Sequence, residues 1–414
     1  MQFQAGKKKK AVRVVMVTGA YFPEVSGAGL QCRSLIGAAR ALADDLAFTV
    51  VTTSTGCSLP FHDRVDGVEV YRLPADGKIS GLFKWPALLC YLFFRVLAGA
   101  DIIHLHGFSR KSYFFVLAGL LTRKKVLLKM SSLGEDDPPS VMGTRGRFLR
   151  KRFYRLAHCY LAPGPALESA FRASGLGDER LAALPNGVDC DRFKPVENEK
   201  EKRALRIRLG LPETGLLVLF VGHFSQDKRP ALLAWAWREL QAGEVGLVMV
   251  GATDPEAYEV DRKVVDEVKR VAARAGENPG SLVLVERTGN IEEFFRACDI
   301  FALPSVREGL PNALLEAMAC GLACVATRLP GVTDHLIWPD AGVLVEPDQV
   351  SSFTVAIKGL VRDSSLRKEL GARARKKILD GGFELREVAA RYRELYLQMV
   401  SRETSGGANQ RESG

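Results

Sequence analysis

The most informative part of the chain is Val306-Arg-Glu-Gly-Leu-Pro-Asn-Ala-Leu-Leu-Glu-Ala-Met-Ala-Cys-Gly321. The apolar run at residues 299–304 before it predicts a buried strand, Pro311 suits the first turn of a helix, and Gly321 is typical of a helix end. We therefore expect a strand, a turn and a helix in succession, which is the building unit of a parallel α/β sheet.

Two carboxylates frame this turn, since Glu308 precedes the expected helix and Glu316 lies inside it. At a rise of ~1.5 Å per helical residue, their separation suits the distance from the sugar ring to the ribose of a nucleotide diphosphate sugar. The free N–H groups expected around Asn312, Ala313 and Leu314 form an anion site. A surface Glu followed by an ordinary helical Glu remains the alternative.

Other segments place this motif in a family. They are Leu184-Pro-Asn-Gly-Val-Asp189 followed by Arg192-Phe193 and Pro195, Leu205-Arg206 with Leu209-Gly-Leu-Pro212, Phe220-Val-Gly-His223 with Lys228, and Asp101-Ile-Ile-His-Leu-His106. With Glu308-x7-Glu316, they resemble the retaining glycosyltransferases of family 4, which have the GT-B fold. The resemblance covers roughly residues 11–400.

The fold class that this implies is α/β, with two doubly wound Rossmann-like domains facing across a cleft. Short apolar runs alternate with helical stretches, and the pattern restarts after the charged residues 194–202. We expect an acceptor-binding domain over residues 1–193, a nucleotide-sugar-binding domain over 194–382, a helix at 383–400 that returns to the first domain by resemblance, and a disordered tail at 401–414. The expected strands are residues 12–18, 48–53, 101–106, 125–130, 160–162, 182–184, 216–222, 246–250, 281–285, 300–303 and 323–326.

Charge and cysteine usage exclude several classes of protein. The chain of 414 residues has a net charge of +10, clustered at residues 7–10 and 145–155, which favours an anionic partner. No zinc-finger, RNA-binding or helix-turn-helix pattern is present in the sequence, so we expect no nucleic acid partner. Eight scattered cysteines and the lack of a secretory signal pattern predict a cytoplasmic protein.

The resemblance assigns roles in the donor site. Glu316 would bind the ribose hydroxyls and Glu308 the sugar hydroxyls. Backbone N–H groups of Asn312, Ala313 and Leu314 would contact the diphosphate. Gly309 would allow close approach of the chain, and Leu310 adjoins it, although Gly309 can equally serve the turn and Asn312 the helix cap.

Lys228 is the expected counter-ion of the departing diphosphate. Relatives usually have Arg after the glycine of this strand, whereas here His223 follows Gly222. Arg229, next to Lys228, could supply the missing charge, although neighbouring residues at a helix start point in different directions. A hydrogen-bonded core histidine is the alternative reading of His223.

Four further features belong to the first domain. Gly27 and Gly29 lie between the first strand and the first helix and resemble the family's glycine-rich loop, with a plain turn as the alternative. Ser131 and Ser132 stand where relatives often have His near the sugar. His106, at a strand end, is expected to reach the cleft in a catalytic role, and His104 to pack beneath a helix. The acidic run at residues 135–137 could bind acceptor hydroxyls or a cation, but a charged, solvated loop is the more common meaning of such a run.

The predicted reaction is metal-independent transfer, with retention, of a sugar from a nucleotide diphosphate sugar to a hydroxyl of a lipid-linked or cell-surface polysaccharide. No cofactor is expected, and Asp189-Cys-Asp191 is read as a hinge rather than a metal clamp. A sugar-nucleotide epimerase and a binding subunit without activity stay open. We also expect attachment to an anionic membrane surface through Arg145, Arg147, Arg150, Lys151, Arg152 and Arg155, with residues 81–100 as a second contact or, alternatively, a core helix.

Overall fold

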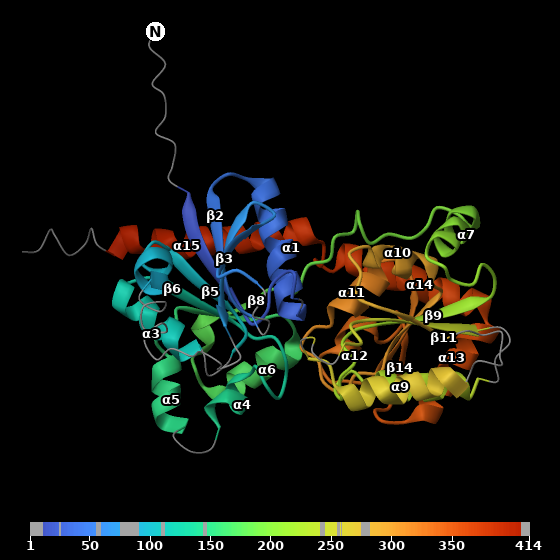
Figure 1. Cartoon of the computed structure of the whole chain (residues 1–414). Coiled ribbons are helices and arrows are strands. Elements are labelled where there is room, and N and C mark those ends of the chain that lie inside the picture. Colours follow the sequence, from blue (N-terminus) through green and yellow to red (C-terminus); the bar gives the residue numbers. More distant parts are fainter. Residues whose placement is uncertain are drawn as a thin grey trace, which may run out of the picture. The chain divides into compact units, whose positions relative to one another are not determined.

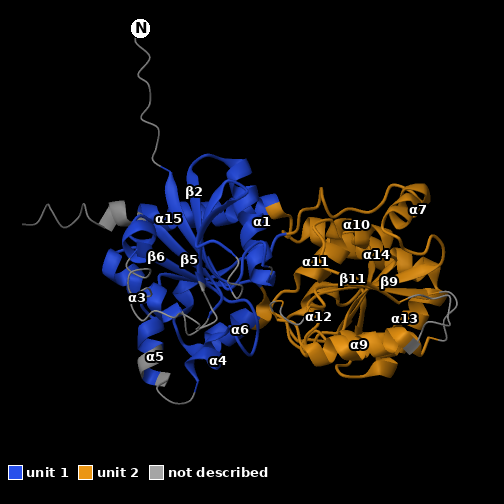
Figure 2. Cartoon of the chain, in the orientation of Figure 1, with its two compact units in different colours: residues 1–163, 167–187, 386–414 blue, residues 164–166, 188–385 orange. Residues whose placement is uncertain are grey.

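The chain folds into two compact units, each built on its own sheet (Figure 2). The computed structural model describes residues 11–24, 26–54, 59–74, 91–108, 112–143, 147–240, 245–254, 257, 259–274 and 282–406. Unit 1 comprises residues 1–163, 167–187 and 386–414, and unit 2 comprises residues 164–166 and 188–385.

Unit 1 contains an eight-stranded sheet with the order β3-β4-β2-β1-β5-β6-β7-β8, in which only β3 and β4 pair antiparallel. Its strands are β1 (Val12–Thr18), β2 (Leu46–Ser54), β3 (His62–Val65), β4 (Val68–Pro74), β5 (Ile102–His106), β6 (Lys125–Lys129), β7 (Cys159–Ala162) and β8 (Leu181–Ala183). Successive side chains of β1 face opposite sides of the sheet, so Val14 and Met16 enter one core cluster and Val15 enters the other.

Helices cover both faces of this sheet (Figure 1). They are α1 (Gly27–Leu42), the π-helical turn η1 (Leu92–Leu97), α3 (Ser112–Thr122), α4 (Pro138–Met142), α5 (Arg147–Tyr154), α6 (Pro165–Ser174), the short 3-10 turn η2 (Asp178–Arg180) and α15 (Leu385–Gly406). One core cluster joins α1 and α15 to the sheet through residues such as Leu35 and Tyr392, and the other joins η1 and α3 through Leu97 and Val116.

Unit 2 contains a parallel six-stranded sheet with the order β11-β10-β9-β12-β13-β14. Its strands are β9 (Leu216–Val221), β10 (Val245–Val250), β11 (Leu282–Val285), β12 (Ile300–Leu303), β13 (Ala323–Thr327) and β14 (Val343–Val345). Its helices are α7 (Glu199–Arg208), α8 (Pro230–Arg238), α9 (Arg262–Arg274), α10 (Ile291–Ala297), α11 (Asn312–Ala319), α12 (Thr333–Ile337), α13 (Val350–Arg362) and α14 (Ser364–Asp380).

The strand orders predict where ligands bind. In unit 1 the order reverses at β1, which lies between β2 and β5, and in unit 2 it reverses at β9, which lies between β10 and β12. Open parallel sheets bind ligands beyond the carboxyl ends of the strands at such switch points. The residues after β5 in unit 1, and the loops after β9 and β12 in unit 2, are therefore the places to search.

The boundary between the units falls between Gly187 and Val188 rather than at the predicted 193/194. Val188 N donates to Phe383 O at 2.8 Å and Leu385 N donates to Val188 O at 2.9 Å, so hydrogen bonds tie Val188 to unit 2. Residues from Arg386 onward belong to unit 1, where Tyr392 and Tyr396 of α15 are buried. The helix also continues to Gly406, so residues 401–406 are helical rather than disordered, because extending a formed helix costs little.

The hairpin β3–β4 and the edge strand β14 were missed by the sequence analysis. Asp66 and Gly67 form the hairpin turn with φ of 50° and 74°, and an Asp-Gly pair between alternating apolar residues is a strong hairpin signal that was present in the sequence. β14 has three residues, too few to show a period. For residues 81–100 the sequence predicts a membrane contact or a core helix. Residues 81–90 lie outside the described part of the chain, and the π-helical turn η1 lies within residues 91–100.

Candidate functional site

The loops that follow β9 and β12 meet through two ion pairs. Nζ of Lys228 lies 2.6 Å from Oε1 of Glu308, and Nη2 of Arg307 lies 2.5 Å from Oδ2 of Asp227. Val306 N also donates to Asp227 O at 2.8 Å. Because β9 and β12 are neighbours in the sheet, the loops that follow them lie side by side. Asp227-Lys228 of one loop therefore pairs with Arg307-Glu308 of the other.

The Lys228–Glu308 pair is largely shielded from solvent. Glu308 is 8% exposed and the side chain of Lys228 is 26% exposed. The structure therefore brings together the two residues that the sequence analysis gave separate catalytic roles. The Asp227–Arg307 pair beside them was missed, although adjacent opposite charges in both loops were a signal for it.

The helix α11 begins directly after this loop. Pro311 is its N-cap and provides no side-chain hydrogen bond, and no acidic residue lies in the first turn. The positive end of the helix dipole is therefore not offset by a carboxylate of its own first turn. Leu314 N, however, donates to Pro311 O at 3.1 Å, so this N–H is already used, contrary to the expectation that it is free.

The side chains beside the N-terminus of α11 serve mainly in packing. Leu310 and Leu314 are buried in the core of unit 2, and Ala313 packs against the same cluster. Gly309 is buried, while Asn312 is half-buried and engaged in an interaction. Contact of the diphosphate with the backbone N–H groups of Asn312 and Ala313 stays a prediction, whereas the N–H of Leu314 is already used.

Glu316 lies one helical turn further along α11 and is half-buried. Burial raises the pKa of its carboxyl group to about 8, with Glu292 adding to this effect and Arg192 opposing it. Arg192 is itself held by Glu292, with 2.6 Å between Nη2 and Oε2. Near neutral pH the carboxyl is therefore mostly protonated, and a strongly shifted acid is typical of functional sites.

The two other cations expected near the diphosphate are Arg229 and His223. Arg229 has a left-handed backbone at φ 50°, and its Nε lies 2.9 Å from Oδ1 of Asp348 after β14. Its guanidinium therefore pairs away from the Lys228–Glu308 pair, so it does not supply the charge missing at His223. His223 is half-buried, with its Nε2 3.9 Å from Oε2 of Glu259. Gly222, whose N donates to Val250 O at 3.1 Å, directly follows β9.

In unit 1, His106 and Lys129 end the neighbouring strands β5 and β6. His104 donates to or accepts from the hydroxyl of Tyr396 on α15 at 2.7 Å, so it packs beneath a helix as expected. His106 is also buried, and burial and the nearby Lys129 hold its pKa well below the usual range. Among the described residues its Nε2 has no hydrogen-bond partner. The expectation that His106 is open to a cleft disagrees with this burial.

Lys129 was not singled out from the sequence. It is buried, its Nζ donates to Oδ1 of Asn186 at 2.8 Å, and burial lowers its pKa to about 8. Its position at the end of the apolar run of β6 gives no sign of this burial, because a lysine near a strand end normally reaches solvent.

The glycine and serine candidates of unit 1 have structural partners. A Cβ on Gly29 would lie 2.2 Å from Ala20 O, and Gly29 N donates to Oγ of the N-cap Ser26 at 3.0 Å. Packing of α1 against the preceding loop therefore explains Gly29, while Gly27 is exposed at the helix start and engaged in an interaction of its own. Ser131 Oγ donates to Asp136, and Ser132 Oγ donates to Leu133 O at 3.4 Å.

The acidic run is not a solvated loop throughout. Asp137 is buried as the N-cap of α4, where its Oδ1 accepts from Ser140 N at 2.8 Å and its Oδ2 from Gly134 N at 2.5 Å. Capping by a carboxylate satisfies N–H groups at a helix start. The sequence interpretation was therefore wrong for Asp137.

Of the predicted basic segment, Arg145 lies outside the described residues. Arg147, Arg150, Lys151 and Arg152 belong to α5, and Arg155 follows it. Arg152 and Arg155 are exposed, Lys151 is half-buried, and Phe148 is 84% exposed. Phe153 instead packs edge-on against Tyr113, with 4.9 Å between ring centroids.

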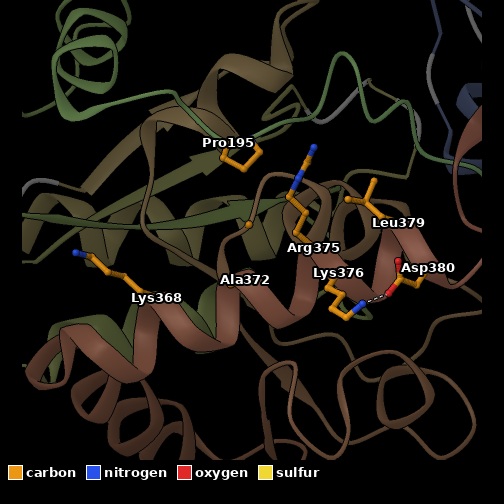
Figure 3. Close-up of a pocket in the computed structure, with 8 residues that line it drawn as sticks. Pro195, Lys368, Ala372, Arg375, Lys376, Leu379 and Asp380 are labelled. Atoms are coloured by element: carbon orange, nitrogen blue, oxygen red, sulfur yellow. Dashed lines mark hydrogen bonds and ion pairs between the residues drawn. The ribbon is translucent and has the colours of Figure 1, made fainter.

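A hollow of about 490 Å³ lies along α14 in unit 2 (Figure 3). It is lined by Pro195, Gly321, Lys368, Ala372, Arg375, Lys376, Leu379 and Asp380. Arg375 donates from its floor to Ala319 O, at the C-terminal end of α11. The hollow therefore adjoins the end of α11 opposite to Asn312, and it contains none of the predicted donor residues.

Two family models match the chain. The model for glycosyl transferases group 1 matches residues 201–377, and the model for a glycosyl transferase 4-like domain matches residues 26–187. The chain is 29% identical over 378 residues to a D-inositol 3-phosphate glycosyltransferase of Xylanimonas cellulosilytica, covering 86% of this chain and 87% of that protein.

A second relative matches a shorter part of the chain, and a solved structure matches its fold. The chain is 28% identical over 230 residues to the UDP-Gal:alpha-D-GlcNAc-diphosphoundecaprenol alpha-1,3-galactosyltransferase of Escherichia coli, covering 53% of this chain and 55% of that protein. The structure of Anabaena HepE in complex with UDP and glucose superposes with a TM-score of 0.73 at 18% identity, covering 94% of this chain and 100% of that one.

No helix among the described residues is long and apolar enough to cross a membrane. The two parallel sheets, the pair of matching family models and the superposition of nearly the whole chain agree with one another. The chain belongs to glycosyltransferase family 4, the group 1 glycosyltransferases with the GT-B fold, which use nucleotide sugars.

Proposed function

We propose that the protein transfers a glycosyl group from a nucleotide diphosphate sugar to an acceptor hydroxyl with retention at the anomeric carbon. One observation carries this proposal: the Lys228–Glu308 pair adjoins the N-terminus of α11, and Glu316 follows one turn along the same helix. Two carboxylates and a helix N-terminus thereby lie along one strand-turn-helix unit, in the order that a diphosphate sugar requires, and the cation Lys228 reaches this unit from the loop after β9.

The proposed roles follow from these positions. Lys228 and the N-terminus of α11 stabilise the negative charge that develops on the leaving diphosphate when the glycosyl bond breaks. The leaving diphosphate accepts the proton of the acceptor hydroxyl on the same face of the sugar, so no protein nucleophile is needed. Glu308 binds sugar hydroxyls, and Glu316 binds the ribose, where a protonated carboxyl can both donate and accept a hydrogen bond.

We also propose that this reaction needs no metal ion and no cofactor, because fixed positive charge at Lys228 and α11 serves the diphosphate. The Asp189-Cys-Asp191 triplet has a different use in the chain. Oδ1 of Asp189 accepts from Asp191 N at 3.1 Å and from Arg192 N at 3.0 Å, which forms a turn.

The proposed acceptor is a lipid-linked or cell-surface polysaccharide intermediate. The Escherichia coli relative is named for a diphosphoundecaprenol-linked sugar, and the net charge of +10 suits a phosphate-bearing acceptor. A second candidate is a soluble phosphorylated polyol, because the relative named for D-inositol 3-phosphate matches a larger part of the chain. On the acceptor side we assign Ser131 and Ser132, which are half-buried just after β6.

A panel of labelled nucleotide sugars tests the donor side. Slow hydrolysis of one donor, together with transfer to a phosphate-bearing acceptor, is the expected result. Isomerisation of the sugar nucleotide without transfer indicates an epimerase, and binding without any turnover indicates an inactive subunit. Either of these results contradicts the proposed function. Acceptors with and without a lipid separate the two candidate acceptors.

We propose that this reaction takes place on the cytoplasmic face of the membrane, with the protein attached through the basic segment at residues 145–155. Each basic residue near an anionic surface contributes ~1 kcal/mol, so several of them support a reversible and salt-sensitive attachment.

A further inference from the structure

The helix α3 of unit 1 exposes an apolar face that the sequence analysis did not identify. Leu117, Leu120 and Leu121 are 44%, 52% and 67% exposed. Their spacing of three and four residues places them on one side of the helix. The opposite side of α3, with Phe115 and Gly119, is buried, and Val116 and Ala118 on the flanks are buried as well, so the leucines are not needed to hold the helix on its sheet. We call Leu117, Leu120 and Leu121 the leucine face.

Exposed aromatic residues lie on the two elements that pack against α3. Phe94 on η1 is 69% exposed, and Phe148 on α5 is 84% exposed. In Figure 1, α3 and α5 are neighbours on the same side of unit 1, and Tyr113 of α3 contacts Phe153 of α5. Large apolar side chains thus extend beyond a single helix. Such clusters on a water-soluble surface mark interaction sites.

Cations follow the leucine face along the chain, and Asp101, whose backbone carbonyl accepts from Lys125 N, is paired with Arg13. Arg123 is exposed and Lys124 is half-buried, directly after the C-terminal end of α3, and neither side chain has an ion-pair partner among the described residues. On α5 and just after it, Arg152 and Arg155 are exposed. From residue 102 to residue 166 the sequence has no carboxylate except Glu135, Asp136 and Asp137. Asp137 is buried as a helix cap, and Asp136 is held by Ser131.

We propose that the leucine face inserts into the headgroup boundary of an anionic lipid bilayer, while Arg123, Lys124 and the basic residues of α5 contact the lipid phosphates. This deepens the proposed membrane attachment, which named only the basic segment. Apolar side chains beside unpaired cations match a surface that is negative outside and apolar beneath. A second copy of the chain fits this face less well, because a symmetric interface would bring the same basic residues of both copies together.

The two parts of this surface have separable effects. The attraction of Arg123 and Lys124 to lipid phosphates falls with ionic strength, whereas burial of the leucines does not. Removing these charges should therefore reduce the preference for anionic lipid. Removing the leucines should abolish the binding that persists in high salt.

The test is vesicle co-sedimentation of the full chain without donor or acceptor, so a failure of the transferase proposal leaves its outcome unaffected. The vesicles are equimolar phosphatidylglycerol and phosphatidylcholine, or phosphatidylcholine alone. We expect the triple variant L117N/L120N/L121N to bind the anionic vesicles at least about tenfold more weakly than wild type, a change of about 1.4 kcal/mol. The variant R123E/K124E should reduce the difference between the two vesicle types, since the basic residues of α5 remain in place.

Val355→Asn is the matched control, because Val355 is 70% exposed on α13 of unit 2. This variant should bind the vesicles as wild type does. Unchanged thermal melting of the triple variant separates lost binding from lost folding. Equal vesicle binding by wild type and the triple variant overturns the proposal. So does a wild-type dimer that the triple variant converts to a monomer, because the face then binds a second copy.

Tryptophan fluorescence tests directly whether α3 enters the lipid. Leu121→Trp should gain fluorescence that is quenched by brominated phosphatidylcholine in the anionic vesicles, beyond the signal of the native tryptophans. Val355→Trp should show no such gain. If both tryptophans respond alike, the bilayer contact does not lie at α3.

Discussion

Lys228 and Glu308, from loops after two neighbouring strands of unit 2, form an ion pair with 2.6 Å between Nζ and Oε1. The cation proposed for the leaving diphosphate is therefore partly neutralised before any donor binds, and the carboxylate proposed for the sugar is held in place by that cation. Donor binding must share Lys228 between Glu308 and phosphate oxygens. The two residues should behave as one unit in mutational experiments.

The first prediction is that stability and activity separate in a double-mutant cycle. Lys228→Met leaves the carboxylate of Glu308 shielded and unpaired, and should lower the free energy of unfolding by about 1–3 kcal/mol. K228M/E308Q should regain most of this stability because no charge is left unpaired. Sugar transfer should stay abolished in the double variant, because no cation remains for the diphosphate.

Urea unfolding and donor turnover measure the two quantities on the same proteins. Arg307→Met and Asp227→Asn, which break the neighbouring pair, are the control for general disruption of the loops. Recovery of turnover in K228M/E308Q would contradict a role of Lys228 in the reaction.

The second prediction is that Glu308 and Glu316 affect different steps of the reaction. Glu316→Ala should weaken donor binding through lost ribose contacts, whereas Glu308→Ala should mainly lower kcat through lost sugar contacts. Calorimetric titration with the nucleoside diphosphate alone distinguishes them, because only the Glu316 contact involves the nucleoside. Equal affinity of wild type and Glu316→Ala for the nucleoside diphosphate would contradict the proposal that Glu316 binds the ribose.

The third prediction is a pH dependence of stability that arises from Glu316. Its pKa is raised in the folded protein from 4.5 to about 8, so the folded state binds more protons than the unfolded state between these values. Stability from this group is present below pH 4.5 and is lost as pH rises toward 8. Glu316→Gln should flatten this slope, so that the variant gains stability relative to wild type as pH increases.

Denaturant unfolding of wild type and Glu316→Gln at several pH values between 5 and 9 measures the effect. Glu292→Gln should reduce the slope only slightly, since burial rather than Glu292 is the main cause of the shift. Parallel pH profiles for wild type and Glu316→Gln would show that this carboxyl does not titrate abnormally.

The fourth prediction is that transfer proceeds with retention and without a metal ion. Excess chelator should leave the rate unchanged, because the positive charge at Lys228 and α11 does not depend on added cations. NMR of the product should show the anomeric configuration of the donor. An inverted product, or complete loss of activity with EDTA that added metal restores, would refute the prediction.

The fifth prediction is that the basic segment contributes to membrane binding. At low salt the protein should pellet with anionic but not with neutral vesicles, and R150E/K151E/R152E should abolish this by reversing the local charge. R203E/R208E on α7 of unit 2 reverses a comparable charge elsewhere and should bind as wild type does. Equal partitioning of the α5 variant and wild type would reject this helix as a contact.

The α/β class, most of the strands and the strand-turn-helix unit from Glu308 to Glu316 could be predicted from the sequence, because they follow from local periodicity and from the residues that start and stop helices. The partners of the charged side chains depend on the folded chain. Lys228 pairs with Glu308, Arg229 pairs with Asp348, and His106 is buried. These contacts join residues that are distant in the sequence, so periodicity cannot reveal them. The leucine face of α3 also emerges only on folding, because a helix that is apolar on every side does not show in its sequence which side the core covers.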